Sequence, residues 1–283
     1  MMKLRKMLCA AAMFGMTMLP AHAEEKTITI GTMQWEDLGA ISGVTKKALE
    51  DSGYTVKVVS FSEWGIAYAA LSKGDIQILA SLTDYVAQDY WDKNKKKLEK
   101  ISPVSFGLYQ AIAVPNYVPI DSMEQLNANA DKFSGKIVGI EPGSGLMRDA
   151  ANSVKAYDLK LQLVEGSTAA MTAELKSAID RKEWIAVTLW EPSWMIQKYP
   201  VKFLKDPKAI FPLAQTYNWI AKSGFSTENP HAREVIASVY LPLADITAIA
   251  GAVADGKTMD EAVKGWTDTH ADLLKRWENI KSK

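Results

Sequence analysis

The segment at residues 185–194 reads IAVTLWEPSW, and the organisation of the whole chain follows from it. Its first five residues are apolar or β-branched, which predicts a buried strand. The strand has to end at Pro192, because proline has no N–H to give to a neighbouring strand. Trp190 therefore lies at the carboxyl end of a strand, the edge where open α/β sheets bind ligands. Trp190 is either a large core residue or a ligand contact, and its position favours the ligand contact.

Strand-like and helix-like segments alternate on both sides of this stretch. Strands are expected where short apolar or alternating runs end at glycine, proline or a turn, and helices where apolar residues recur at helical spacing. Helices of about ten to fifteen residues between strands indicate βαβ units and mainly parallel sheets. The expected strands span residues 27–31, 54–60, 76–80, 107–114, 136–140, 160–164, 185–189 and 216–222. The last three expected helices span residues 228–239, 243–254 and 258–277.

Two of the expected strands connect two lobes. The strand at 107–114 stops at Pro115, and a capping-box pattern at Asp121-Ser122-Met123-Glu124 restarts the chain beyond it. The strand at 216–222 carries the chain back. We therefore expect an α/β fold in which residues 24–112 and 219–283 form lobe 1 and residues 113–218 form lobe 2.

Side chains that start or anchor helices can also be named. Ser167 is expected to cap a helix that ends at Arg181, and Thr258 opens the final helix with a second capping box. On that final helix, Trp266 and Trp277 share one apolar face, which predicts that both pack in the core.

The first 23 residues have the pattern of a secretory signal peptide. A charged start is followed by an apolar stretch, Met7 to Leu19, and by the small-residue ending Ala21-His22-Ala23. Cys9 lies inside the leader without the small residues that precede a lipid-accepting cysteine, so no lipoprotein anchor is expected. Cleavage after Ala23 leaves 260 residues without cysteine. It also removes three of the 33 basic residues, which leaves 30 against 33 acidic ones. These features predict a periplasmic protein and exclude a nucleic-acid-binding or membrane-spanning one.

The residue types that catalysis and metal binding require are scarce. Only His231 and His270 remain after the leader, with no cysteine, so no transition-metal site is expected. The Gly143-Ser144-Gly145 turn lacks the third glycine of a dinucleotide fingerprint, and neither a Gly-x-Ser-x-Gly elbow nor a phosphate-binding loop occurs. The adjacent carboxylates Glu36 and Asp37 are typical of a helix start. We expect no enzymatic activity, no cofactor and no metal.

Aromatic residues instead follow several strands. In mainly parallel sheets these strand ends gather at one edge of each lobe and face each other across a cleft. Aromatic faces attract quaternary ammonium groups by about 0.5–2 kcal/mol for each contact, which for three or four contacts falls short of the roughly 8 kcal/mol of micromolar binding. The expected aromatic contacts are Trp35, Trp64, Tyr85, Tyr109 and Trp190.

Two helix starts can hold the other end of such a ligand. Backbone N–H groups at residues 36–38 and 144–146 are suited to a carboxylate or a hydroxyl. Asp37 is an alternative contact, because its carboxylate accepts from a hydroxyl or complements a cation. Ser144 is either a ligand contact or a simple helix cap.

Six motifs of this chain occur together in one known family: Tyr68–Asp75 (YAALSKGD), Tyr90-Trp91, Gly139–Gly143 (GIEPG), Trp190–Met195 (WEPSWM), Lys202–Pro207 (KFLKDP) and the segment from Gly256 to Trp266. Through them the chain resembles the periplasmic substrate-binding proteins of ABC transporters for glycine betaine, choline and related osmoprotectants. This resemblance implies a two-lobed type II binding-protein fold with two hinge crossings, a ligand trapped by lobe closure, and a membrane permease with a cytoplasmic ATPase as partners. We expect the receptor itself to be a monomer.

The resemblance also implies roles for single residues. Trp190 matches a cage tryptophan common to the family, while Trp35 with Asp37, Tyr109 and Ser144 resemble ligand contacts of its choline-binding branch. Leu82 and Leu241 depart from the pattern, since relatives place cage tryptophans there. A quaternary-ammonium receptor is therefore expected, with two alternatives left open: a receptor for another amino acid-like solute, or a sensing module of a membrane signalling protein.

Overall fold

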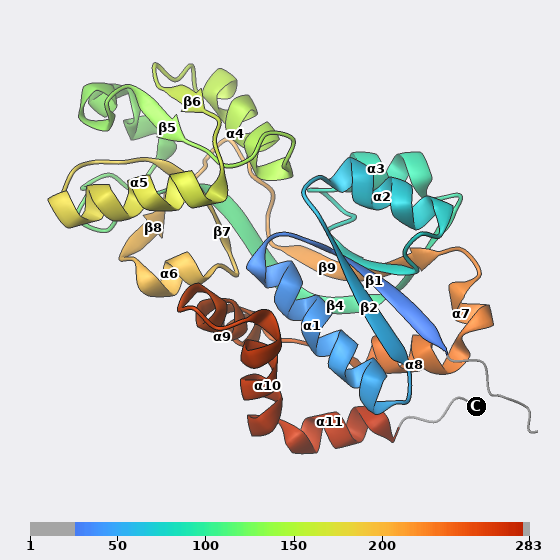
Figure 1. Cartoon of the computed structure of the whole chain (residues 1–283). Coiled ribbons are helices and arrows are strands. Elements are labelled where there is room, and N and C mark those ends of the chain that lie inside the picture. The colour runs from blue at the N-terminus through green and yellow to red at the C-terminus, as the bar shows by residue number, and fades with distance from the viewer. Residues whose placement is uncertain (1–25, 280–283) are drawn as a thin grey trace, which may run out of the picture.

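Strand β4 (Leu98–Pro115) runs through both halves of the molecule. In the computed structural model, which describes residues 26–279, its first part pairs with β9 (Gln215–Lys222) and its last part with β7 (Val187–Glu191) and β8 (Val201–Phe203). Figure 1 shows β4 joining the two lobes. The strand order β2-β1-β3-β9-β4-β7-β5-β6, with β8 on β4, makes one continuous sheet of nine strands.

The first lobe combines the N-terminal βα units with the C-terminal helices. Helices α1 and α2 follow strands β1 and β2, as the alternating pattern predicts. The strands are β1 (Thr27–Met33), β2 (Thr55–Phe61) and β3 (Ile78–Ser81), and the helices are α1 (Glu36–Asp51), α2 (Trp64–Lys73), α3 (Gln88–Asn94), α7 (Phe225–Glu228), α8 (Pro230–Ser238), α9 (Leu243–Ala254), α10 (Met259–Thr269) and α11 (Ala271–Glu278).

The second lobe is a smaller βα series. Ser144 caps α4 and Ser167 caps α5, each accepting a backbone N–H three residues later, as their sequence positions indicate. Its further elements are β5 (Lys136–Val138), β6 (Gln162–Val164), α4 (Gly145–Ala156), α5 (Thr168–Arg181), α6 (Trp194–Lys198) and two 3₁₀ segments, η1 (Met123–Gln125) and η2 (Asn127–Phe133).

Parallel and antiparallel pairing are segregated in the sheet. The pairs β1 with β2 and β3, and β5 with β6 and β7, are parallel. Every antiparallel pair contains β4 or β9. These are the strands that were expected to cross. β4 connects the lobes, whereas β9 pairs with β3 and with residues 98–108 of β4, so the chain has returned to the first lobe before β9.

Each lobe has its own core, and the two cores separate at the crossings. The first core includes β4 residues up to Leu108 and resumes at Tyr217, while the second extends from Ala111 to Phe211. The expected lobe limits at 112/113 and 218/219 stay a prediction. Trp35 packs against both cores, so the lobes touch through its side chain.

The final helix differs from its expected extent. We expected one helix over residues 258–277, but the structure ends α10 at Thr269 and starts α11 at Ala271. The chain turns at His270, whose ring stacks on Trp266 at 4.2 Å between centroids and whose Nδ1 lies 2.8 Å from the Trp266 carbonyl oxygen. This local contact replaces helix continuation. Trp277 still stacks near Trp266 in the first core, as its apolar face predicts.

The expected signal peptide, including Cys9, lies outside the described residues. Within residues 26–279, no single helix is long and apolar enough to cross a membrane; α8 and α9 together satisfy the length and composition criteria but are bent by 91°.

Trp277→Ala tests the packing role of this residue. The indole is buried, so its truncation leaves a cavity under α11 and is expected to lower the free energy of unfolding by about 3–5 kcal/mol. Urea unfolding of the wild type and the variant measures this. A loss below about 1 kcal/mol would show that α11 does not stabilise the first lobe.

Candidate ligand-binding site

A small cavity lies between the two lobes. Its volume is about 50 Å³, enough for the centres of only a few water molecules at roughly 10–15 Å³ each. Most of its lining is apolar. The lining residues are Trp35, Asp37, Leu38, Trp64, Leu82, Val86, Leu108, Gln110, Ile140, Ser144, Gly145, Leu146 and Trp190.

Three tryptophans from three different elements meet at this cavity. Trp35 is the N-cap of α1, Trp64 is the first residue of α2, and Trp190 comes from β7 of the other lobe. The rings of Trp35 and Trp64 are 6.0 Å apart and inclined at 41°. Both also have a buried indole N–H that has no hydrogen-bond partner among the described residues. Electron-rich rings that can attract a cation therefore line the cavity, and two indole donors beside it are unpaired within the described part of the chain.

Asp37 places a buried carboxylate on the same cavity. Tyr217 donates a hydrogen bond to its Oδ2 at 2.5 Å, but Oδ1 is buried and has no partner among the described residues. Burial, with a smaller contribution from the neighbouring Glu36, raises the pKa of Asp37 to about 6, although the hydrogen bond from Tyr217 and the nearby backbone N–H groups of Leu38 and Asp37 oppose the rise. Near neutral pH the cavity thus contains a negative charge with one free acceptor.

The first turn of α4 supplies donors from the second lobe. Ser144 Oγ accepts from the Met147 N–H at 3.2 Å, while Gly145 and Leu146 line the cavity at positions whose N–H groups have no partner within the helix. Gly145 also lies against Val86 of the first lobe, and a Cβ built on Gly145 would be 2.8 Å from Val86 Cα. A glycine is therefore needed for the lobes to approach this closely.

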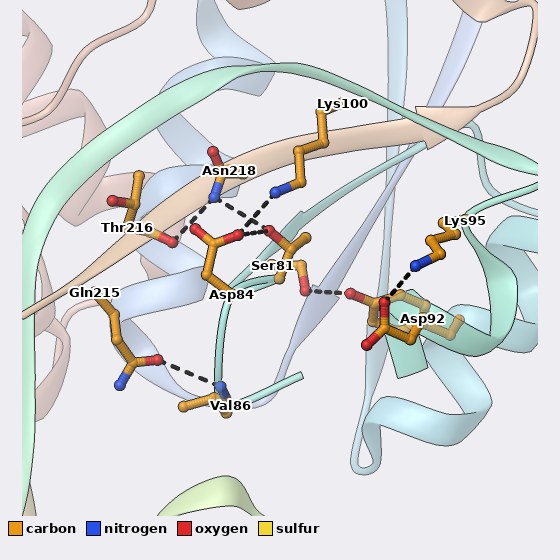
Figure 2. Close-up of polar contacts among 11 residues, drawn as sticks. Ser81, Asp84, Val86, Asp92, Lys95, Lys100, Gln215, Thr216 and Asn218 are labelled. Atoms are coloured by element: carbon orange, nitrogen blue, oxygen red, sulfur yellow. Dashed lines mark hydrogen bonds and ion pairs between the residues drawn. The ribbon is translucent and has the colours of Figure 1, made fainter. Parts of the chain in front are cut away.

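The loop after β3, residues 82–87, brings the first lobe to this contact. Figure 2 shows how β4 and β9 hold it: Lys100 Nζ donates to Asp84 Oδ1 at 2.8 Å, and Val86 N–H donates to Gln215 Oε1 at 3.3 Å. Asn218 adds a weaker contact of 3.4 Å to Thr83. Contacts with β4 and β9 therefore position the loop at the place where it meets α4.

The structure brings together five of the seven expected contacts. Trp35, Asp37, Trp64, Ser144 and Trp190 line the cavity. Their role in binding a ligand stays a prediction.

Tyr85 and Tyr109 do not line the cavity. The hydroxyl of Tyr85 lies 3.3 Å from both Asp149 Oδ1 and the Ile210 carbonyl oxygen, and its ring stacks under Arg148. The ring of Tyr109 packs edge-on against Phe203, 5.1 Å between centroids.

The two departures from the family pattern have different positions. Leu82 lines the cavity, whereas Leu241 is fully buried in the first core. Tyr240 is half exposed and packs beside Phe106.

Sequence reasoning missed other residues of the site. Gln110 lines the cavity in the middle of β4, and a lone amide within an apolar run is the one signal that could have indicated it. Tyr217 pairs with Asp37 across 180 positions, for which no local pattern exists.

Two more open grooves adjoin the cavity. One, of about 570 Å³, includes Thr168, Lys176 and Trp194; the other, of about 260 Å³, includes Glu63 and Tyr90. Trp35 lines both grooves and the cavity, so it separates them. Among the described residues, no group of three or more His, Cys, Asp or Glu side chains is arranged to hold a metal ion.

Comparison with known proteins gives relatives along nearly the whole described chain. The glycine betaine/carnitine transport binding protein GbuC of Listeria monocytogenes is 33% identical over 162 residues, which cover 56% of this chain and 53% of that protein. The chain thus aligns with about half the length of this relative. A glycine betaine/proline betaine-binding periplasmic protein of Escherichia coli is 23% identical over 94% of this chain and 90% of that protein.

The fold of this chain is also similar to that of a solved structure. Lactococcal OpuAC, in a closed conformation complexed with glycine betaine, superposes with a TM-score of 0.83 at 29% identity, over 90% of this chain and 100% of that chain. The two lobes form the type II periplasmic binding protein fold that the family resemblance implies. Residues 26–269 match the family model OpuAC, the substrate-binding domain of ABC-type glycine betaine transport systems, and the chain belongs to that family.

Proposed function

We propose that this chain is the periplasmic receptor of an ABC importer and captures a small quaternary-ammonium or amine-bearing compound of the glycine betaine and choline class. The observation that carries the proposal is the cavity between the lobes, which is lined by three tryptophans and by Asp37, whose Oδ1 accepts no hydrogen bond from the residues that the structure describes. Names of relatives support the class, since GbuC is a glycine betaine/carnitine binding protein.

A methylated ammonium group has no N–H to donate, so ring faces and a negative charge have to hold it. A desolvated ring contributes about 2 kcal/mol, and three rings therefore about 6 kcal/mol. Micromolar affinity needs about 8 kcal/mol. Asp37 provides further attraction in a buried place where water screens little.

The polar end of the ligand has two possible partners. A carboxylate is suited to the N–H groups of Gly145 and Leu146, whereas a hydroxyl can donate to Asp37 Oδ1. Glycine betaine and choline share the cationic end and differ here, so both belong to the proposed ligand class.

Transport follows from lobe closure. A ligand held by both lobes stabilises the closed arrangement, which a permease and its cytoplasmic ATPase then recognise. The expected leader at residues 1–23 and the periplasmic E. coli relative support a periplasmic location. We further propose that the receptor works as a monomer and by binding alone, so that the ligand is released chemically unchanged.

A ligand panel with Trp190→Ala tests this function. Betaine, choline, carnitine, proline betaine, histidine and taurine are added to the mature chain, and thermal unfolding is followed. A true ligand at about 100 times its Kd adds roughly 2.7 kcal/mol to the free energy of unfolding. Trp190→Ala is expected to fold and to lose this shift.

Trp277→Ala is the matched control, because it removes a buried indole of the first core outside the cavity. It should lose stability and keep the ligand shift. If no amine moves the melting curve of the wild type, the proposed ligand class is wrong; if Trp190→Ala keeps its affinity, the tryptophan cage is wrong.

Asp37→Asn tests how much stability the protein loses by ionising the buried carboxylate and whether this carboxylate contributes to ligand binding. Because burial raises the pKa of Asp37 to about 6 from an ordinary 3.8, the folded protein holds a proton between these pH values that the unfolded chain does not. Wild-type stability contributed by Asp37 therefore falls as pH rises from about 4 to 6, by about 3 kcal/mol in total. Asp37→Asn should stabilise the ligand-free protein at pH 7, do little at pH 4, and weaken choline binding.

Urea unfolding at pH 4, 5, 6 and 7 measures the stability difference between wild type and Asp37→Asn, and calorimetric titration measures choline affinity. A stability difference that does not change with pH would mean that Asp37 ionises normally. Undiminished choline affinity would mean that its carboxylate does not face the ligand.

Gly145→Ala tests whether the observed approach of the lobes is needed for binding. The added Cβ would be 2.8 Å from Val86 Cα, closer than real contacts allow. Ligand affinity is expected to fall about tenfold or more, with little change in the ligand-free melting temperature. Gly166→Ala is the control, since its nearest neighbour would be 3.6 Å away. Equal affinity of both variants for the ligand would contradict the role of this contact.

A further inference from the structure

Asp149 is a second buried carboxylate, and it lies just outside the cavity. Its side chain is fully buried in α4 of the second lobe. Gln110 Nε2 donates a hydrogen bond to Asp149 Oδ2 at 3.0 Å. Asp149 Oδ1 accepts a hydrogen bond from Tyr85 Oη at 3.3 Å and lies 3.4 Å from Arg148 Nε. Asp149 is absent from the cavity lining, whereas Gln110 is part of it.

The carboxylate of Asp149 determines the orientation of the Gln110 side-chain amide. An ionised carboxylate only accepts hydrogen bonds, and all three partners of Asp149 are donors. Gln110 must therefore turn its NH₂ group toward Asp149. The two ends of an amide have the same shape, so its orientation is set by the hydrogen-bond network around it. Because Nε2 donates to Asp149, Oε1 is the amide atom that remains available to a ligand in the cavity.

The orientation of the Gln110 amide decides which of its polar atoms is available beside Trp190. Gln110 on β4 is paired directly with Trp190 on β7, next to the proposed cage. Its Oε1 accepts no hydrogen bond from the residues that the structure describes, and this oxygen is not fully enclosed by protein atoms. The cavity therefore has a second acceptor besides Asp37 Oδ1.

We propose that Asp149 is a positioning residue for ligand specificity: it holds Gln110 so that the ligand meets the amide oxygen and not the amide NH₂. This inference rests on the proposed function and deepens it. A ligand that brings a hydroxyl donor or a cationic group to Gln110 is favoured. A carboxylate at the same place meets an acceptor and is disfavoured.

Asp149→Asn tests the inference, because an asparagine of the same shape can donate as well as accept and releases Gln110 to rotate. Dissociation constants for choline and for glycine betaine are measured by calorimetric titration of the mature chain. The affinity ratio of choline to glycine betaine is expected to fall about tenfold. If the wild type binds one compound alone, choline binding must weaken or glycine betaine binding must strengthen in the variant.

Gln110→Leu separates positioning from a merely structural role. It removes the acceptor and should lower the ratio by about the same factor, and it also serves if Asp149→Asn fails to fold. Adding Asp149→Asn to Gln110→Leu should then leave the ratio unchanged. Asp180→Asn, an exposed ion-paired aspartate of the same lobe, is the control and should keep the wild-type ratio.

An unchanged ratio in Asp149→Asn or in Gln110→Leu overturns the inference while the proposed function stands. The same is true if Asp149→Asn shifts the ratio equally in the Gln110→Leu background. Binding of neither compound by the wild type overturns the inference as well, and the wider ligand panel then decides separately whether the proposed function stands.

Discussion

The close approach of two separately folded lobes is the constraint on which the rest of the structure depends. Each lobe has its own core, and the chain crosses between them on β4 and again before β9. A cage for a cation exists only where Trp35 and Trp64 of one lobe meet Trp190 of the other. Gly145 against Val86, Tyr85 against Asp149 and the 2.9 Å ion pair of Lys198 with Asp255 all lie at this meeting of the lobes. Specificity and closure are thus parts of one interface.

Two buried carboxylates give this interface its electrostatic character. Burial raises the pKa of Asp37 and that of Asp149 to about 6, so both are costly to ionise in the folded protein. The guanidinium of Arg148 opposes the rise in pKa at Asp149, whereas at Asp37 the opposing groups are the Tyr217 hydroxyl and backbone N–H groups, which carry no full positive charge. A buried carboxylate without a cationic partner is a loss of stability that a bound cation can recover. This is the pattern expected where stability is given up for binding.

Local signals in the sequence predicted the elements and part of the site. The apolar run before Trp190 and the caps Ser144 and Ser167 depend on neighbours within a few positions, and they were found as expected. Tyr109, expected in the cage from its place in the crossing strand and from the family resemblance, packs on Phe203 instead, because alternate residues of a strand face opposite sides and it is Leu108 and Gln110 that line the cavity. The pairing of Asp37 with Tyr217 and the need for glycine at Gly145 arise between distant segments, which no local pattern reveals.

A crystal structure of the mature chain with choline or glycine betaine tests the central claim most directly. The trimethylammonium group is expected between Trp35, Trp64 and Trp190, within about 6 Å of the ring centroids, with the carboxylate of Asp37 beside it. A ligand bound instead in the groove formed by Thr168, Lys176 and Trp194, with no ligand density among the three indoles, would contradict it.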